Sequence, residues 1–250
     1  MALPSPLQVE PSVRAKDARI PALAIFNRLG NLFLALSTKT DIDVASMVAV
    51  WLVDSGGRQF DPRRASLRFE VHQFFDVWGK RSRQEFDAHY RFGGHNLQLG
   101  NPWESHEFRA AETDPFAAVH HNQNSEYAAL TLARVLAGEE MALRSAWIGT
   151  SHISLNLFSS LGYPSTGEMY TAFQESERFH VLGFFDFCST RPAPKVGDLL
   201  RYLRGHDWLN FAKFYGGHAK SDYMTRLRAS FDIASTVLNA KSVLSETGIL

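Results

Sequence analysis

The sequence predicts a mostly α-helical globular domain. Apolar residues recur at helical spacing in several stretches, and the signals for β-strands are few. Hydrophobic residues make up 45% of the 250 residues and charged residues 21%, which is enough apolar material for a full core. The length suits one large domain, or one domain with an extra lobe, and the sequence contains no internal repeat.

The sequence up to Asp54 predicts an extended arm followed by two helices. Residues 1–21 contain four prolines, which favour extended backbone. Apolar spacing predicts a helix over residues 22–36. Asp41 or Asp43 can cap a second helix, which we expect to end near Asp54.

The remaining segments predict a short extended piece, a long loop and further helices. Residues 67–78, LRFEVHQFFDVW, alternate at first and then take helical spacing, and residues 79–123 are polar and weakly periodic, which is typical of a long loop region. Helical spacing returns at 125–147, 167–188, 196–204, 206–215 and 220–238. We expect one domain over residues 22–240 and a C-terminal tail over 241–250.

Composition excludes several classes of partner. Lys plus Arg equals Asp plus Glu at 26 each, so we expect no general nucleic-acid partner. No apolar run approaches the roughly 20 residues that span a bilayer, so no membrane insertion is expected. The N-terminus lacks the pattern of a secretory signal, which predicts a cytoplasmic location in the producing cell.

Cys188 is the only cysteine in the chain. A single cysteine excludes an intrachain disulfide and a cysteine-based zinc site. It lies on the apolar face of the segment GFFDFC, so we expect a core residue and not a nucleophile.

The segment WLVDSGG places a carboxylate at the end of an apolar helix. Asp54 follows the run from Val48 to Val53, and Gly56 or Gly57 suits the left-handed residue that ends a helix. A helix C-terminus disfavours negative charge, so the pKa of Asp54 should rise, as a general acid requires. The alternative is a surface aspartate in a turn.

Glu70 and His72 follow the loop that begins after Asp54. A loop of this length can fold back and bring two carboxyl groups together. Two acids across a cleft are the groups that cleave a glycosidic bond. The alternative is that Glu70, which alternates with Phe69 and Val71, faces solvent.

The ten histidines do not form a recognisable metal motif. His120 and His121 are adjacent and cannot share one helix face, and no His-Glu-x-x-His pattern occurs. His89, His95 and His106 are scattered through the predicted loop. We therefore expect no metal ion and no other cofactor.

The segment DWLNFAKFYGG has two interpretations. Trp208 and Phe211 at helical spacing indicate core positions, together with Leu227 further along the chain. Tyr215 followed by glycines, with Tyr223 nearby, is also typical of the edge of a sugar-binding cleft.

Several stretches, in this order, resemble the N-acetylmuramidase domain of endolysins from phages that infect Gram-negative bacteria, and of some phage-like particles. The resemblance runs from roughly Phe26 to Ala234. The family's Val-Glu-Ser-Gly-Gly, Phe-Glu-Arg-His, Ala-Leu-Arg-Ser-Ala, Asp-Trp-x-x-Phe-Ala-x-x-Tyr-Asn-Gly and Tyr-x-x-x-Leu patterns correspond to residues 53–57, 69–72, 142–146, 207–217 and 223–227.

The departures from the family pattern fall on residues expected to take part in catalysis or glycan binding. Asp54 stands for the family's glutamate, His152 for a glutamine in the cleft turn, and Gly216 for an asparagine. Aspartate is one methylene shorter than glutamate, a retreat of about 1.5 Å for the carboxyl group. A misplacement of about 1 Å can slow a reaction on the order of 10²-fold.

The resemblance implies a lysozyme-like, mostly α fold with a cleft between helical lobes, and hydrolysis of the β-1,4 bond between N-acetylmuramic acid and N-acetylglucosamine in peptidoglycan. Asp54 would protonate the leaving oxygen, and Glu70 and His72 would act on the other side of the bond. His152, Tyr215, Gly216 and Tyr223 would line the glycan groove.

Two alternatives stay open at this point. One is a catalytically decayed, peptidoglycan-binding, plug or structural component of a phage tail or contractile injection particle, which would have particle proteins as partners. The other is a binding protein unrelated to cell walls.

Overall fold

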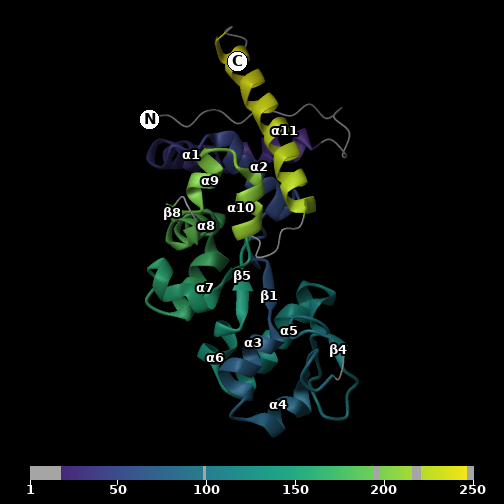
Figure 1. Cartoon of the computed structure of the whole chain (residues 1–250). Coiled ribbons are helices and arrows are strands. Elements are labelled where there is room, and N and C mark those ends of the chain that lie inside the picture. The colour runs from purple at the N-terminus through teal and green to yellow at the C-terminus, as the bar shows by residue number, and fades with distance from the viewer. Residues whose placement is uncertain (1–17, 98–99, 194–196, 216–220, 247–250) are drawn as a thin grey trace. The chain divides into compact units, whose positions relative to one another are not determined.

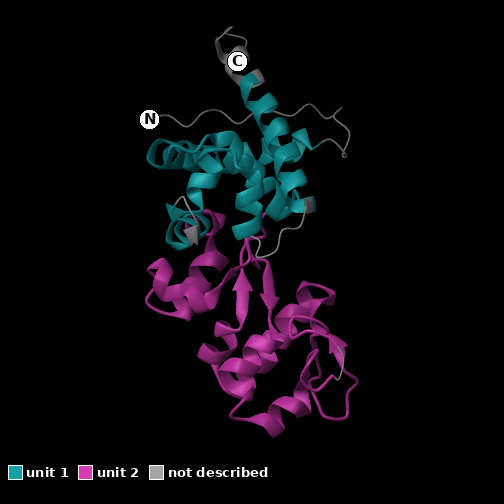
Figure 2. Ribbon diagram, viewed as in Figure 1, with its two compact units in different colours: residues 1–59, 184–250 teal, residues 60–183 magenta. Residues whose placement is uncertain are grey.

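The chain divides into two compact units, which are described separately here from a computed structural model (Figure 2). The first unit contains residues 1–59 and 184–250, and the second contains residues 60–183. The structure describes residues 18–97, 100–193, 197–215 and 221–246. The predicted N-terminal arm therefore lies almost entirely outside the described residues.

The first unit is helical, and its core is built on α2 (Val44–Ser55). This helix buries nine of its twelve residues, because apolar side chains cover all its faces. Both α1 (Arg19–Thr40) and α11 (Ser221–Glu246) pack against it (Figure 1). The remaining elements are the second half of α8 (Glu177–Thr190), the strands β7 (Pro192–Ala193) and β8 (Gly197–Asp198), α9 (Leu200–Arg204) and α10 (Trp208–Tyr215).

Local signals explain where α2 begins and ends. The Asp43 side chain accepts a hydrogen bond from the Ser46 N–H at 2.8 Å, which caps the helix N-terminus. Gly56 takes the left-handed conformation, with φ of 59°, and ends the helix. The prediction of a helix that ends beside Asp54 is confirmed.

The second unit combines short helices with two small antiparallel sheets. The first sheet has the order β1-β5-β6, and the second has the order β2-β3-β4. Its strands are β1 (Leu67–Phe69), β5 (Ala146–Ile148), β6 (Ile153–Ser154), β2 (Tyr90–Arg91), β3 (Glu107–Phe108) and β4 (Ala117–Ala118). Its helical segments are α3 (Val71–Phe74), the π-helical η1 (Phe75–Gly79), α4 (Arg83–His89), η2 (Val119–His121), α5 (Gln123–Ala137), α6 (Glu139–Arg144), η3 (Leu155–Leu161), α7 (Thr166–Glu175) and the first half of α8.

The pairing of β1 with β5 positions the segment that carries Glu70. Leu67 pairs with Ile148 and Phe69 with Ala146. The backbone N–H of Glu70 continues the pairing by donating to the Ser145 carbonyl at 2.9 Å. Helix α3 begins at the next residue, so the prediction of a short extended piece that enters a helix is confirmed.

Four sequence predictions of local structure are wrong in detail. The predicted helix over 196–204 begins only at Leu200, because Gly197 and Asp198 form strand β8. The predicted helix over 125–147 is broken at Gly138, whose φ of 83° is incompatible with a right-handed helix, and the stretch ends as strand β5. The predicted helix over 167–188 is interrupted at Ser176, whose backbone is extended. The predicted loop over 79–123 contains α4 and the sheet β2-β3-β4, because short two-residue strands leave no periodic pattern.

The mostly helical fold class is confirmed, and so are the predicted core residues. Trp208 is 9% exposed, and Phe211 and Leu227 are fully buried. The Cys188 side chain is also fully buried, and burial followed by the nearby charge of Asp54 raises the pKa of its thiol well above the usual value. The thiol therefore stays protonated, which agrees with a core role.

Helix α1 is long and apolar enough to cross a membrane by length and composition. The buried core helix of a water-soluble protein meets the same criterion, and one face of α1 is buried in the first unit, including Ile25, Leu29 and Phe33. The expectation that no apolar run approaches a bilayer-spanning length is wrong for α1. The expected lack of membrane insertion stays a prediction.

Trp208→Ala should destabilise the protein by about 3–5 kcal/mol, because it removes a large buried side chain that contacts Phe231 and His206. Urea denaturation measures the change. The matched control is Leu209→Ala at the next position, where the side chain is 59% exposed and the expected change is below about 0.5 kcal/mol. Equal effects of the two substitutions would show that Trp208 is not part of the core.

The buried His180 should make the protein less stable in acid. Burial lowers the pKa of His180 below its usual 6.5, although its hydrogen bond to the Phe173 carbonyl acts in the opposite direction. Below pH 6.5, His180 therefore binds a proton more readily in the unfolded chain than in the folded chain. Its contribution to stability is present above about pH 6.5 and falls by up to about 1.4 kcal/mol per pH unit below it.

Denaturant titrations between pH 7.5 and 5 test this, and His180→Gln should flatten the slope. His121→Gln, at an exposed histidine, should keep the parental slope. A parental slope in His180→Gln would contradict the assignment.

Candidate active site

Asp54 lies in the last turn of α2, next to the left-handed Gly56. Its side chain is half-buried. The carbonyl groups at the end of a helix repel negative charge, so a carboxylate in this turn needs compensating donors.

Two tyrosine hydroxyls supply these donors. The Tyr215 hydroxyl, at the end of α10, donates to Oδ2 of Asp54 at 2.6 Å, and the Tyr223 hydroxyl, on α11, donates to Oδ1 at 2.9 Å. Both carboxylate oxygens are therefore held by groups from other helices of the same unit. Hydrogen bonds to an ionised carboxylate favour the charged form, whereas the helix end disfavours it, so the two effects oppose each other at Asp54.

The two tyrosines remain donors over the whole physiological pH range. Burial, followed by the negative charge of Asp54, raises the pKa of both phenols well above the usual 10. The Tyr215 ring stacks on Phe211 with centroids 5.0 Å apart and meets Phe184 edge-on at 5.5 Å. These core contacts fix the position of its hydroxyl.

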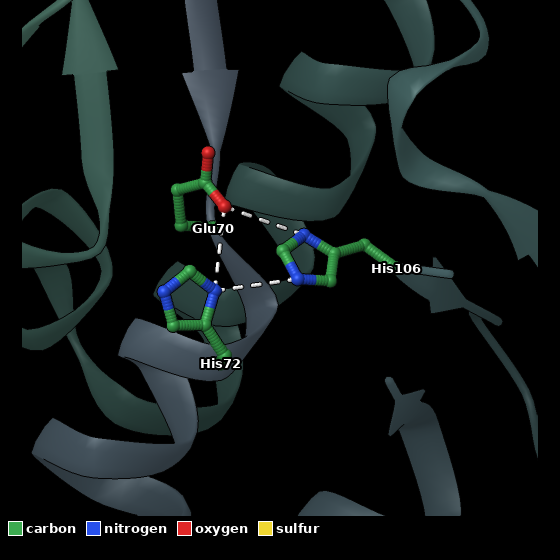
Figure 3. A group of neighbouring side chains, drawn as sticks. All are labelled: Glu70, His72 and His106. Atoms are coloured by element: carbon green, nitrogen blue, oxygen red, sulfur yellow. Dashed lines mark hydrogen bonds and ion pairs between the residues drawn. The ribbon is translucent and has the colours of Figure 1, made fainter. Parts of the chain in front are cut away.

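Glu70 lies in the second unit, between β1 and α3, and is only 6% exposed. The alternative of a solvent-facing Glu70 is therefore wrong. The Arg68 side chain donates to its Oε1 at 2.5 Å. Its Oε2 faces Nδ1 of His72 at 3.4 Å and Nδ1 of His106 at 3.5 Å (Figure 3).

Glu70 is ionised at any pH at which the protein is expected to work. Burial raises its pKa, but the neighbouring His72 and Arg68 outweigh this and lower the pKa to about 2. Oε2 is nevertheless buried without a hydrogen-bond partner among the described residues. Two imidazole nitrogens thus lie close to this oxygen, and neither makes a hydrogen bond to it.

His106 connects Glu70 to a buried chain of polar groups. Burial, the largest influence, lowers the pKa of His106 to about 4, so its ring is neutral near pH 7. Its Nε2 lies 2.9 Å from the Pro102 carbonyl, which only accepts hydrogen bonds, so this nitrogen carries the proton. Nδ1 then accepts from Nε2 of His120 at 2.8 Å.

Glu126 completes this chain from α5. Its Oε1 contacts Nδ1 of His120 at 2.8 Å, and its Oε2 accepts the backbone N–H of Phe69 at 2.7 Å. Sequence reasoning missed the roles of His106, His120 and Glu126. The spacing of histidines gave no signal, because the residues meet through β1, η2 and α5 and not within one element.

His152 lies in the turn between β5 and β6, in a left-handed conformation with φ of 44°. Its Nε2 is 3.1 Å from the Ser66 hydroxyl. In the same turn, the buried Ser151 hydroxyl oxygen has no hydrogen-bond partner among the described residues. The turn thus presents polar groups, and a glycan-binding role for His152 stays a prediction.

The structure brings the predicted site residues into two groups. Asp54, Tyr215 and Tyr223 meet in the first unit, and Glu70 meets His72 in the second. The prediction that Asp54 and Glu70 face one cleft concerns both units and stays a prediction. Gly216 lies outside the described residues.

Comparisons with known proteins agree with this fold. The N-acetylmuramidase family profile matches residues 43–235, which is most of the chain and includes both groups. The protein therefore belongs to the N-acetylmuramidase family.

Among solved structures, the chain is similar to the Burkholderia AP3 phage endolysin, with a TM-score of 0.60 and 24% sequence identity. The match covers 82% of this chain and 70% of the endolysin and shows an endolysin-like fold. A comparison with curated protein sequences gives no match.

Tyr215→Phe and Tyr223→Phe should each reduce stability by about 1–2 kcal/mol, because each removes one hydrogen bond to a half-buried charged group. A double-mutant cycle with Asp54→Asn, followed by urea denaturation, isolates this interaction. Coupling energies near zero in both cycles would show that the hydroxyls do not hold the Asp54 carboxylate.

Proposed function

We propose that this protein hydrolyses the β-1,4 bond between N-acetylmuramic acid and N-acetylglucosamine in peptidoglycan, with Asp54 as the essential carboxyl group. The observation that supports this most directly is the fixation of Asp54, which the sequence resemblance aligns with the family's glutamate, by two tyrosine hydroxyls. A carboxyl group is pre-organised for reaction when both of its oxygens are held in place.

The proposed chemistry assigns different tasks to the two acids. Asp54 in its protonated form gives its proton to the glycosidic oxygen as the bond to the sugar breaks. Glu70, with a pKa of about 2, stays ionised, and its assigned task is either to activate water or to stabilise the positive charge that develops on the sugar ring. His72 and Arg68 keep it ionised.

Glycan binding is assigned to residues in each unit. Tyr215 and Tyr223 lie next to Asp54 in the first unit, and His152 lies in the turn between β5 and β6 of the second unit. Sugars bind well to such combinations of aromatic faces and hydrogen-bonding groups, since they carry both apolar faces and hydroxyls.

The second candidate is a member of the family whose hydrolase site has decayed and which binds peptidoglycan in a particle. The observation that favours it is the shorter side chain at position 54. The two tyrosine donors also favour its ionised form, and an ionised group cannot donate a proton.

Asp54→Asn should abolish cleavage of purified peptidoglycan, with a loss of about 10²-fold or more, because the amide cannot donate the required proton. Turbidity clearance gives the rate, and mass spectrometry of the products should show N-acetylmuramic acid at the new reducing ends. Asp232→Asn, an exposed position on α11, is the matched control and should keep parental activity.

Asp54→Glu separates the two candidates. If only the reach of the acid limits the reaction, the added methylene should raise the rate above that of the parent. No cleavage by the parent or by Asp54→Glu, with peptidoglycan still bound in a pull-down, would favour the binding component. Parental activity in Asp54→Asn would remove Asp54 from the catalytic role.

A further inference from the structure

A buried carboxylate oxygen and two imidazole nitrogens meet in the second unit with the arrangement of a metal site. Oε2 of Glu70 lies 3.4 Å from Nδ1 of His72 and 3.5 Å from Nδ1 of His106. One ligand atom from each of the three residues lies within 4.8 Å of the other two. In Figure 3, the carboxylate and both rings point toward one another.

The two separations from Oε2 of Glu70 to the histidine nitrogens suit a tetrahedral transition-metal ion, and the two histidine nitrogens lie within 4.8 Å of each other. With metal–ligand distances of about 2.0–2.2 Å, neighbouring ligand atoms of a tetrahedral site lie about 3.3–3.6 Å apart. Two imidazoles and one carboxylate form a donor set used by zinc, whereas magnesium prefers oxygen ligands. Three protein ligands leave a fourth position for water.

The unsatisfied oxygen is a second observation that points to a ligand. The Glu70 side chain is 9% exposed, and its Oε2 is buried without a hydrogen-bond partner among the described residues. Buried polar atoms are nearly always paired, so this oxygen needs a positively charged or hydrogen-donating neighbour. Its position between two imidazoles makes a cation the fitting partner.

The surrounding residues orient two of the three ligands, Glu70 and His106, as the neighbours of a metal site do. The Arg68 side chain holds the other oxygen of Glu70, and the Pro102 carbonyl accepts Nε2–H of His106 at 2.9 Å. This hydrogen bond fixes the ring and leaves the lone pair on Nδ1, the nitrogen that faces Glu70. We propose that Glu70, His72 and His106 bind one divalent transition-metal ion of the zinc class.

Binding exchanges one hydrogen bond for a metal bond. Nδ1 of His106 accepts a hydrogen bond from Nε2 of His120 at 2.8 Å in the ion-free arrangement. The cation replaces this donor, while His120 stays attached to Glu126 through its other nitrogen. Nδ1 of His72 also lies 3.3 Å from Nε2 of His106, so the two proposed histidine ligands are already in contact.

The test uses the full chain after removal of metal with EDTA. Calorimetric titration with Zn²⁺ should show one ion bound per chain, and Zn²⁺ should raise the melting temperature whereas Mg²⁺ should not. Glu70→Gln and His72→Ala should each weaken Zn²⁺ binding about 10-fold or more. His72 lies at a helix start and is partly exposed, so its removal should leave the fold intact, as circular dichroism can verify.

The matched control is His121→Ala, which removes an exposed histidine beside His120 and should bind Zn²⁺ as the parent does. The proposal is overturned if the parent binds no Zn²⁺, or if Glu70→Gln and His72→Ala both bind it with parental affinity. These measurements do not depend on glycan cleavage, so the failure of one proposal leaves the other intact.

Discussion

The buried carboxylate of Glu126 fixes the part of the second unit on which the chemistry of Glu70 depends. It accepts the backbone N–H of Phe69 through one oxygen and contacts His120 through the other. Strand β1, helix α5 and the η2 turn are thereby tied to one side chain that is 5% exposed. Because Glu70 follows Phe69, and His106 contacts His120, this single group determines where both lie.

The sequence predicted those features of the fold that are determined by residues close together in the chain. The end of α2 at Asp54 followed from the glycines after it, and the burial of Trp208 and Phe211 followed from helical spacing. The breaks at Gly138 and Ser176 were missed, since apolar residues keep helical spacing on both sides of each. A glycine in the sequence can end a helix or be absorbed in one, and only tertiary packing decides between them.

The sequence singled out the two acids of the candidate site, but it did not show which contacts hold them in place. Asp54 and Glu70 stood out because of family motifs, and Tyr215 and Tyr223 because of the aromatic tail. That both hydroxyls end on one carboxylate depends on how α2, α10 and α11 pack, which no local pattern records. A cation on Glu70 and a free Glu70 carboxylate exclude each other, so an ion of the zinc class would act as an inhibitor of the proposed hydrolysis.

The pair of hydroxyls on Asp54 also has an evolutionary consequence. Contacts of 2.6 and 2.9 Å match the length of this side chain, so substitutions at positions 54, 215 and 223 should have coupled effects. A longer acid at position 54 would move the carboxyl group relative to both hydroxyls. The effect of a substitution at one position thus depends on the residues at the other two, which is epistasis among residues from three different helices.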